Sequence, residues 1–184
     1  PTQSEVELIP STAVSYMYFA FCLAMNAAGD LLVVGAPGAT AVPGTTFVYR
    51  LNGTAWSEEW RAGGIGSDYF GYSVGVNGSG DVLAIGVPGR DPTTWLDNQG
   101  AVEVYRHGAS GWLHEATLLP WEAQGVQYVY VGNYIAMSAD GNLLAVSSVS
   151  GSFLPQPNGV TYLFQHVGNA WVQVATLQDP IAYS

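Results

Sequence analysis

The residues best suited to bind a ligand lie in one polar stretch that also contains an indole. Arg90, Asp91, Trp95, Asp97 and Asn98 all fall within residues 90–98. Their charged and amide groups could hold a sugar or a peptide by hydrogen bonds while the indole stacks on an apolar surface. The alternative interpretation is a lid that packs onto the next structural unit. We therefore treat these five residues as candidate ligand-binding residues.

Side chains suited to catalysis are few and scattered. His107, His114 and His166 are the only histidines, and acid–base or metal chemistry needs convergent partners that the sequence does not show. The absence of Lys excludes Schiff-base and P-loop mechanisms. The single cysteine, Cys22, lies in an apolar stretch and is expected to be an unreactive thiol. We therefore predict no enzymatic activity, no catalytic residues, no metal ion and no cofactor.

Two further features concern the surface. Glu58 and Glu59 are adjacent, and neighbours on a strand point to opposite faces, so we expect a solvated surface there. Asn52 and Asn77 each begin an Asn-Gly-Thr or Asn-Gly-Ser sequon within a predicted turn. Both are therefore candidates for N-glycosylation in a secreted protein.

The composition excludes several classes of partner. Of 184 residues, 10% are charged, and fourteen acidic residues against four arginines give a net charge of −10. Binding to a nucleic-acid backbone needs clustered basic residues, so nucleic acid is not an expected partner. The longest apolar stretch, residues 14–25, is too short to span a membrane. With so few charges, we expect self-association, glycans or further repeats to cover apolar surface.

The sequence contains three copies of one repeat, which shows what elements carry these residues. In each copy a turn-like segment rich in Asn, Asp, Ser and Gly precedes an apolar run. Downstream, an aromatic residue at the end of a strand-like stretch precedes a tryptophan by seven positions. The turns are 26–30, 77–81 and 138–142, the apolar runs are 31–34, 82–85 and 143–146, and the tryptophans are Trp56, Trp112 and Trp171. Three copies in one register indicate a structural repeat.

Each copy is typical of four short antiparallel strands. Turns with Gly beside Asp or Asn suit tight hairpins, and an apolar run without alternation is typical of a strand buried on both faces. Four-stranded units repeated at this spacing are typical of propeller blades. The sequence therefore predicts an all-β fold with blades at about 15–62, 66–120 and 127–178.

The ends of the sequence extend the repeat. Residues 5–10 resemble residues 172–177, so residues 1–10 are predicted to be an extra strand of the fourth type, and residues 179–184 the start of a further element. Because the first residue is Pro1, we interpret the chain as processed or as a piece of a longer one. Three blades are fewer than a closed ring contains. We expect an incomplete ring that belongs to a longer chain or is completed by other copies.

Two short motifs recur at fixed places in the repeats. Phe70-Gly71 opens the second unit, and Gly35-Ala36-Pro37 and Gly86-Val87-Pro88 follow the apolar runs of the first two. These residues resemble the FG-GAP repeat family, the integrin-α-like β-propellers, over nearly the whole chain. The resemblance implies a propeller fold and roles such as adhesion or lectin-like binding, although one fold can host many functions.

The repeats also depart from that family. Phe19-Ala20 and Val131-Gly132 stand where Phe-Gly is expected, and Ser147-Ser148-Val149 replaces the second motif in the third unit. The segments that correspond to integrin-type calcium loops, the three turns given above, contain at most two Asp or Asn each. Calcium needs six to eight oxygen ligands. We therefore expect plain hairpin turns without calcium.

Together these features predict a non-enzymatic structural or adhesion module at the cell surface or outside the cell. Its expected partners are other copies of itself, in an oligomer or a filament, or an extracellular protein or glycan held on a loop face. An exposed edge can recruit a strand from elsewhere, so the extra N-terminal strand is a candidate joining element. The alternative function is a lectin-like, carbohydrate-binding propeller module whose exposed Trp and Tyr stack on sugar rings.

Overall fold

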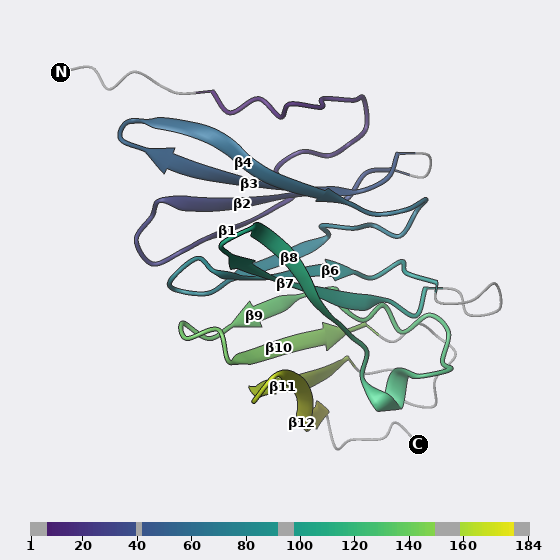
Figure 1. Cartoon of the computed structure of the whole chain (residues 1–184). Coiled ribbons are helices and arrows are strands. Elements are labelled where there is room, and N and C mark those ends of the chain that lie inside the picture. Colours follow the sequence, from purple (N-terminus) through teal and green to yellow (C-terminus); the bar gives the residue numbers. More distant parts are fainter. Residues whose placement is uncertain (1–6, 40–41, 92–97, 150–158, 179–184) are drawn as a thin grey trace.

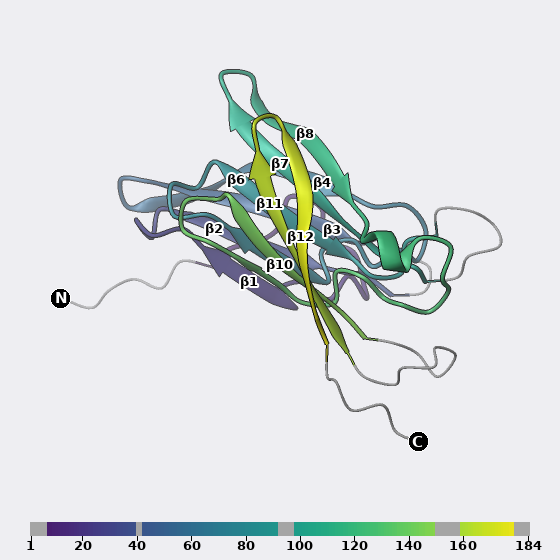
Figure 2. The ribbon, with the colours of Figure 1, turned by 90° about the horizontal axis from the view of Figure 1, so that it is seen from below.

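The computed structural model describes residues 7–39, 42–91, 98–149 and 159–178. Within them the chain forms three four-stranded antiparallel sheets, and one 3₁₀ turn, η1 (Trp121–Ala123), is the helical structure. Figure 1 shows the sheets stacked in chain order, with the second between the first and the third. In Figure 2 the strands of successive sheets run in different directions, so each sheet is rotated relative to its neighbour. The predicted all-β fold of three propeller-type blades in an open arrangement is confirmed.

In every blade the strands pair in the order in which they occur along the chain. The first blade contains β1 (Cys22–Met25), β2 (Leu31–Ala36), β3 (Thr45–Asn52) and β4 (Ala55–Gly63). The second contains β5 (Ser73–Val76), β6 (Val82–Val87), β7 (Ala101–Gly108) and β8 (Gly111–Leu118). The third contains β9 (Ile135–Met137), β10 (Leu143–Ser148), β11 (Val160–Val167) and β12 (Ala170–Gln178).

Apolar side chains between the blades form the core. One cluster, which includes Val33, Phe70 and Ile85, fills the space between the first and second blades. A second, which includes Val104 and Leu144, lies between the second and third. β6 is buried along its whole length, whereas β10 alternates between buried and accessible residues. β10 therefore packs against a neighbouring blade on one face only.

Asparagine side chains close the first hairpin of the first two blades. Asn26 Oδ1 accepts the backbone N–H groups of Asp30 at 3.1 Å and Leu31 at 3.0 Å. Asn77 Oδ1 accepts those of Asp81 and Val82, both at 3.0 Å. The side-chain oxygens of these two asparagines thus fix the turns.

The first strand of each blade begins later than the sequence predicts. The Phe-Gly positions that open the repeats predict strand starts near Phe19, Phe70 and Val131, but β1, β5 and β9 begin at least three residues further on. The cause is a turn in which Ala20, Gly71 and Gly132, directly after the predicted starts, adopt positive φ angles, which extended strands do not contain.

The predicted extra N-terminal strand is not among the strands observed. Residues 7–10 take no strand conformation, although Leu8 packs against the outer face of the first blade. Residues 1–6 and the further element predicted at 179–184 lie outside the described residues.

A β-bulge lies at the same place in the outer strand of every blade. The pairing of β3 with β4 skips Glu59, that of β7 with β8 skips Glu115, and that of β11 with β12 skips Val174. A bulge adds one residue to a strand and redirects the side chains next to it. The three bulge residues therefore leave the simple alternation of a strand.

Candidate functional site

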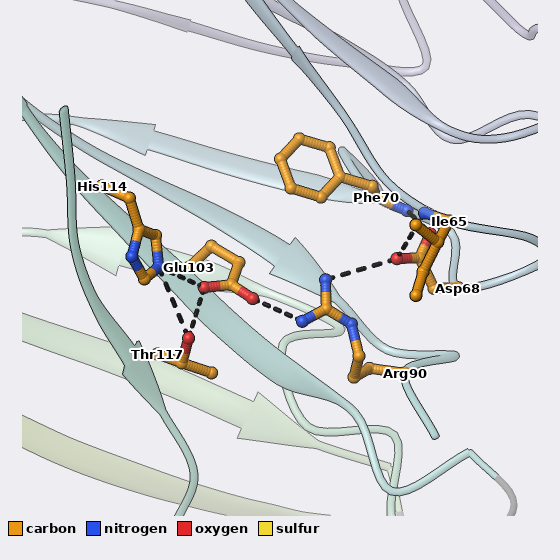
Figure 3. A network of polar contacts seen from close by, with 7 residues as sticks. All are labelled: Ile65, Asp68, Phe70, Arg90, Glu103, His114 and Thr117. Atoms are coloured by element: carbon orange, nitrogen blue, oxygen red, sulfur yellow. Dashed lines mark hydrogen bonds and ion pairs between the residues drawn. The ribbon is translucent and has the colours of Figure 1, made fainter. Parts of the chain in front are cut away.

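The candidate ligand-binding loop is tied into the protein at both of its described ends. Arg90 points inward, with Nη1 2.5 Å from Glu103 Oε1 and Nη2 3.3 Å from Asp68 Oδ2 (Figure 3). Asp91 accepts the backbone N–H of Asn98. The guanidinium of Arg90 and the carboxylate of Asp91, two of the predicted ligand-binding groups, are therefore already paired within the protein.

The end of this loop contacts the third blade. The Asn98 carbonyl accepts the backbone N–H of Tyr130 at 3.0 Å, and Gln99 accepts that of Val131 at the same distance. The described part of the loop thus packs onto the next blade, as the lid interpretation predicts. Trp95 and Asp97 lie outside the described residues, so their part in binding stays a prediction.

Glu103 is the centre of a buried polar network that the sequence did not reveal. Its Oε2 lies 2.6 Å from His114 Nε2 and accepts the Thr117 hydroxyl at 2.6 Å, while Oε1 faces Arg90 (Figure 3). Burial alone raises the pKa of Glu103, but hydrogen bonds from Thr117 and His114 and the charge of Arg90 outweigh it. The pKa therefore lies below its ordinary value, and the carboxylate is ionised at neutral pH.

The same network fixes the turn before β5. Asp68 is buried and accepts the backbone N–H groups of Ile65 at 3.1 Å and Phe70 at 3.2 Å (Figure 3). Arg90 therefore links this turn to Glu103 on β7. A hollow of about 250 Å³ lies beside Asp68 and Arg90.

The geometry of the network is that of a structural clasp. The Thr117 hydroxyl lies 3.4 Å from His114 Nε2, the same ring nitrogen that faces Glu103. In a proton relay the carboxylate and the nucleophile occupy different ring nitrogens. The trio of Glu103, His114 and Thr117 therefore does not form such a relay.

Glu59 joins the first blade to the second. Trp112 Nε1 donates a hydrogen bond to Glu59 Oε1 at 3.0 Å, and His107 Nε2 lies 3.5 Å from the same oxygen. Arg50, from the blade of Glu59, pairs with its other oxygen. These hydrogen bonds and the charge of Arg50 outweigh burial and lower the pKa of Glu59. The expectation of a merely solvated surface at this position was wrong, because the bulge directs Glu59 toward the next blade.

Glu115 repeats this arrangement between the second and third blades. Trp171 Nε1 donates to its Oε1 at 2.9 Å, His166 Nε2 lies 3.1 Å from that oxygen, and Arg106 pairs with the carboxylate from its own blade. We call each such contact a carboxylate latch, which consists of a bulge glutamate, its own Arg, and the Trp and His of the following blade. In the third blade the bulge residue is Val174, which has no carboxylate.

The two outer blade faces are incompletely covered. Leu23 in β1 is 59% exposed, whereas Val74, its equivalent in β5, is 8% exposed because the first blade covers it. Leu143 in β10 is 41% exposed, whereas its equivalent Leu31 in β2 is fully buried under the second blade. Positions that form core between neighbouring blades thus become surface at the two ends of the stack.

An aromatic hollow lies where the first strands of the blades converge. It has a volume of about 360 Å³ and is lined by residues that include Phe21, Tyr72 and Tyr134. The rings of Phe21 and Tyr72 are 4.9 Å apart, and Phe21 and Tyr134 are largely exposed. Exposed rings around a hollow offer flat apolar surfaces to a ligand.

The two sequons have different environments. Asn52 is exposed at the end of β3. Asn77 is 2% exposed, and its amide nitrogen donates to Ser79 Oγ at 2.9 Å and Asp81 Oδ1 at 2.6 Å. The folded turn therefore has no room for a glycan on Asn77, whereas Asn52 stays a candidate.

The Cys22 thiol donates to the Gly71 carbonyl at 3.2 Å, and burial raises its pKa to about 11. The described residues contain no group of three or more His, Cys, Asp or Glu placed to hold a metal ion. No helix in the described part of the chain has the length and apolar character that crossing a membrane requires.

Comparison with known proteins gives a likeness in fold. No family model and no curated protein matches the chain. A solved structure that does match is prolyl oligopeptidase B from Galerina marginata bound to a hydrolysis and macrocyclization substrate, with 9% identity and a TM-score of 0.50. The match covers 90% of this chain and 23% of the oligopeptidase, so the chain spans less than a quarter of that protein. At this identity the likeness shows the propeller-type fold alone.

This match corrects one prediction from the sequence. We predicted a non-enzymatic protein because the repeats lack a convergent catalytic set, but the chain matches in fold a part of a peptidase. A missing catalytic set within these residues is therefore no argument against an enzyme, since such a set can lie elsewhere in a protein that contains this fold. The prediction of a non-enzymatic protein is withdrawn.

Proposed function

We propose that the chain is an extracellular structural or adhesion module that binds a further propeller blade through the first-blade face, where Leu23 and Met25 are exposed beside the cluster that Leu8 and Met17 already cover. The observation that carries the proposal is the reversal of burial at equivalent positions. Leu23 and Met25 in β1 are more than half exposed, whereas Val74 and Val76 in β5 pack into the core beside the first blade. Burying one such side chain contributes about 1.5–3 kcal/mol, so this face gains from a neighbour.

Two further features support a place outside the cell. Only 10% of the residues are charged, which suits a protein whose surface is covered by partners or glycans. Asn52 keeps an exposed sequon at a hairpin tip. Membership of the FG-GAP repeat family is part of the same proposal and is supported by the close contact of its two glycine motifs, in which Gly35 lies against the Gly71 carbonyl.

Hydroxyl-radical footprinting tests the proposed use of the first-blade face. The protein purified from its native source is compared with the same 184 residues expressed alone. We expect oxidation of Leu23 and Met25 to fall several-fold in the native assembly. Leu113 is the matched control, because it is 58% exposed in the middle blade, away from the open face. Equal oxidation of Leu23 and Met25 in the two samples would overturn the proposal.

The aromatic hollow favours carbohydrate binding as a second candidate function. The exposed rings of Phe21 and Tyr134 can stack on the apolar faces of a sugar. Glycan-array binding that is lost on Tyr134→Ala and kept on Leu113→Ala would support it. Absence of binding at millimolar sugar would count against it.

A further inference from the structure

The tryptophan of the first blade lacks the acceptor that its two counterparts have. Trp112 and Trp171 donate their indole N–H groups to the bulge glutamates of the preceding blades. Trp56 holds the same repeat position, packs partly buried against the outer cluster of the first blade, and donates to no described residue. A half-buried indole N–H gains a hydrogen bond when a neighbour supplies an acceptor.

The two filled latches define what that neighbour must carry. Each carboxylate stands at a bulge of an outer strand, and each has an Arg nine residues earlier, Arg50 before Glu59 and Arg106 before Glu115. The Arg is needed because an unpaired carboxylate is costly to place in a partly buried contact. The acceptor for Trp56 is thus expected as an Arg–Glu pair on one β-hairpin.

Resting on the proposed function, we infer that the first-blade face binds a propeller blade from outside these 184 residues, with a glutamate at the bulge of its outer strand and an Arg nine residues earlier. Trp56 donates its indole N–H to that glutamate. Leu23 and Met25 pack against the apolar face of the incoming blade, as Val74 and Val76 do within the chain.

A second copy of this chain is not that partner, because its third blade lacks the latch. Val174 replaces the glutamate and Gln165 replaces the Arg. Head-to-tail stacking of the third blade on a first blade would therefore leave Trp56 without an acceptor. The polar contacts favour a different partner over a filament of identical copies.

The third blade also differs where neighbouring blades touch most closely. A Cβ added to Gly35 would meet the Gly71 carbonyl oxygen at 2.2 Å, and one added to Gly86 would meet the Gly132 oxygen at 2.1 Å. Ser147 holds this position in β10, and its Oγ accepts the Tyr134 backbone N–H at 3.0 Å. A blade that docked in the manner of the second and third would collide with the Ser147 Cβ, so the outer face of the third blade does not accept one.

The inference is tested by restoring the missing residues on the third blade of this same chain. The variant Ser147→Gly/Gln165→Arg/Val174→Glu gives β10–β12 the residues that β2–β4 and β6–β8 use toward their neighbours. We expect this triple variant to self-associate head to tail in sedimentation velocity, with an association constant on the order of ten-fold or more above that of the wild type. Adding Trp56→Phe, which removes only the donor, should abolish most of this gain.

The outcomes separate the inference from the proposed function. A triple variant that associates no more tightly than the wild type, or a gain that survives Trp56→Phe, would overturn the inference. So would a gain that appears only after residues 1–6 are deleted, since the chain's own N-terminal segment would then be the natural occupant. The matched control is Leu113→Glu, which adds a carboxylate at an exposed position of β8 and should leave association unchanged. None of these results alters the footprinting readout, which tests the proposed function alone.

Discussion

Replacing Glu115 by Gln isolates the electrostatic part of the latch between the second and third blades. The amide keeps an oxygen that can accept the Trp171 indole N–H, but it loses the charge that faces Arg106 and His166. Because the apolar cluster between these blades is untouched, the variant should fold and show only the loss of the latch.

The expected cost follows from the contacts that the amide cannot make. Hydrogen bonds to a charged group contribute about 1.5–3 kcal/mol each, and a neutral bond to Trp171 retains about 0.5–1.5 kcal/mol. The pair with Arg106 is partly exposed and adds little beyond its hydrogen bonds. We expect Glu115→Gln to lower the free energy of unfolding by about 2 kcal/mol.

The pH dependence of this loss has a defined sign. Hydrogen bonds from Arg106 and Trp171 and the charge of Arg106 outweigh burial and lower the pKa of Glu115 below 4.5. A carboxylate with a lowered pKa stabilises the folded state at pH values above its ordinary pKa, and that contribution disappears as the pH falls through the folded-state pKa. The difference between wild type and variant should therefore be largest near neutral pH and vanish in acid.

Urea denaturation combined with hydrogen exchange measures the effect and locates it. Amides of β9–β12 should exchange faster in Glu115→Gln, while those of β1–β4 stay unchanged. Glu59→Gln is the matched counterpart and should act between the first and second blades instead. If Glu58→Gln, at a surface pair with Arg61, destabilises the protein as much as Glu115→Gln, or if the loss persists unchanged at low pH, the latch reasoning fails.

Three further predictions concern other contacts. Glu103→Gln should cost about 2–4 kcal/mol in urea denaturation because it removes one of the two carboxylates that pair with the partly buried Arg90; since the pKa of Glu103 is lowered, the cost should shrink in acid, and a pH-independent cost would refute the ion-pair account. Gly86→Ala should lower the melting temperature clearly, since its Cβ meets the Gly132 oxygen, whereas Gly108→Ala has open space and should not. Cys22, with a pKa of about 11, should react with iodoacetamide at pH 8 far more slowly than after unfolding in urea; equal rates would show that the thiol is not held as described.

The repeat made most of the fold predictable from the sequence. Apolar runs without alternation correctly indicated the strands buried between blades, such as β6. The starts of the first strands were missed because Ala20, Gly71 and Gly132 take positive φ angles, which interrupt an extended strand directly after the predicted start. The open stack itself followed from counting three units against the number needed for a ring.

The latches were missed for a reason that lies in strand geometry. Adjacent residues on a regular strand point to opposite faces, so Glu58 and Glu59 read as surface. The bulge that turns Glu59 toward Trp112 depends on pairing with β3 and is not visible in the local sequence. A signal existed nonetheless, because Glu59 and Glu115 each stand three residues after the repeat tryptophan.

The two faces of the third blade differ in how far they keep the residues of the repeat. Gly132 and Trp171 face the second blade, and at both positions the third unit keeps the residue type that this contact requires. Ser147, Gln165 and Val174 occupy the positions that would face a following blade, and all three have changed. A contact that buries an indole, pairs a carboxylate and brings a carbonyl against a glycine constrains residues on both sides at once. The joint loss of three such residues on one face therefore indicates that this face binds no blade of the same kind. The opposite face keeps the indole of Trp56, through which we propose that a blade binds.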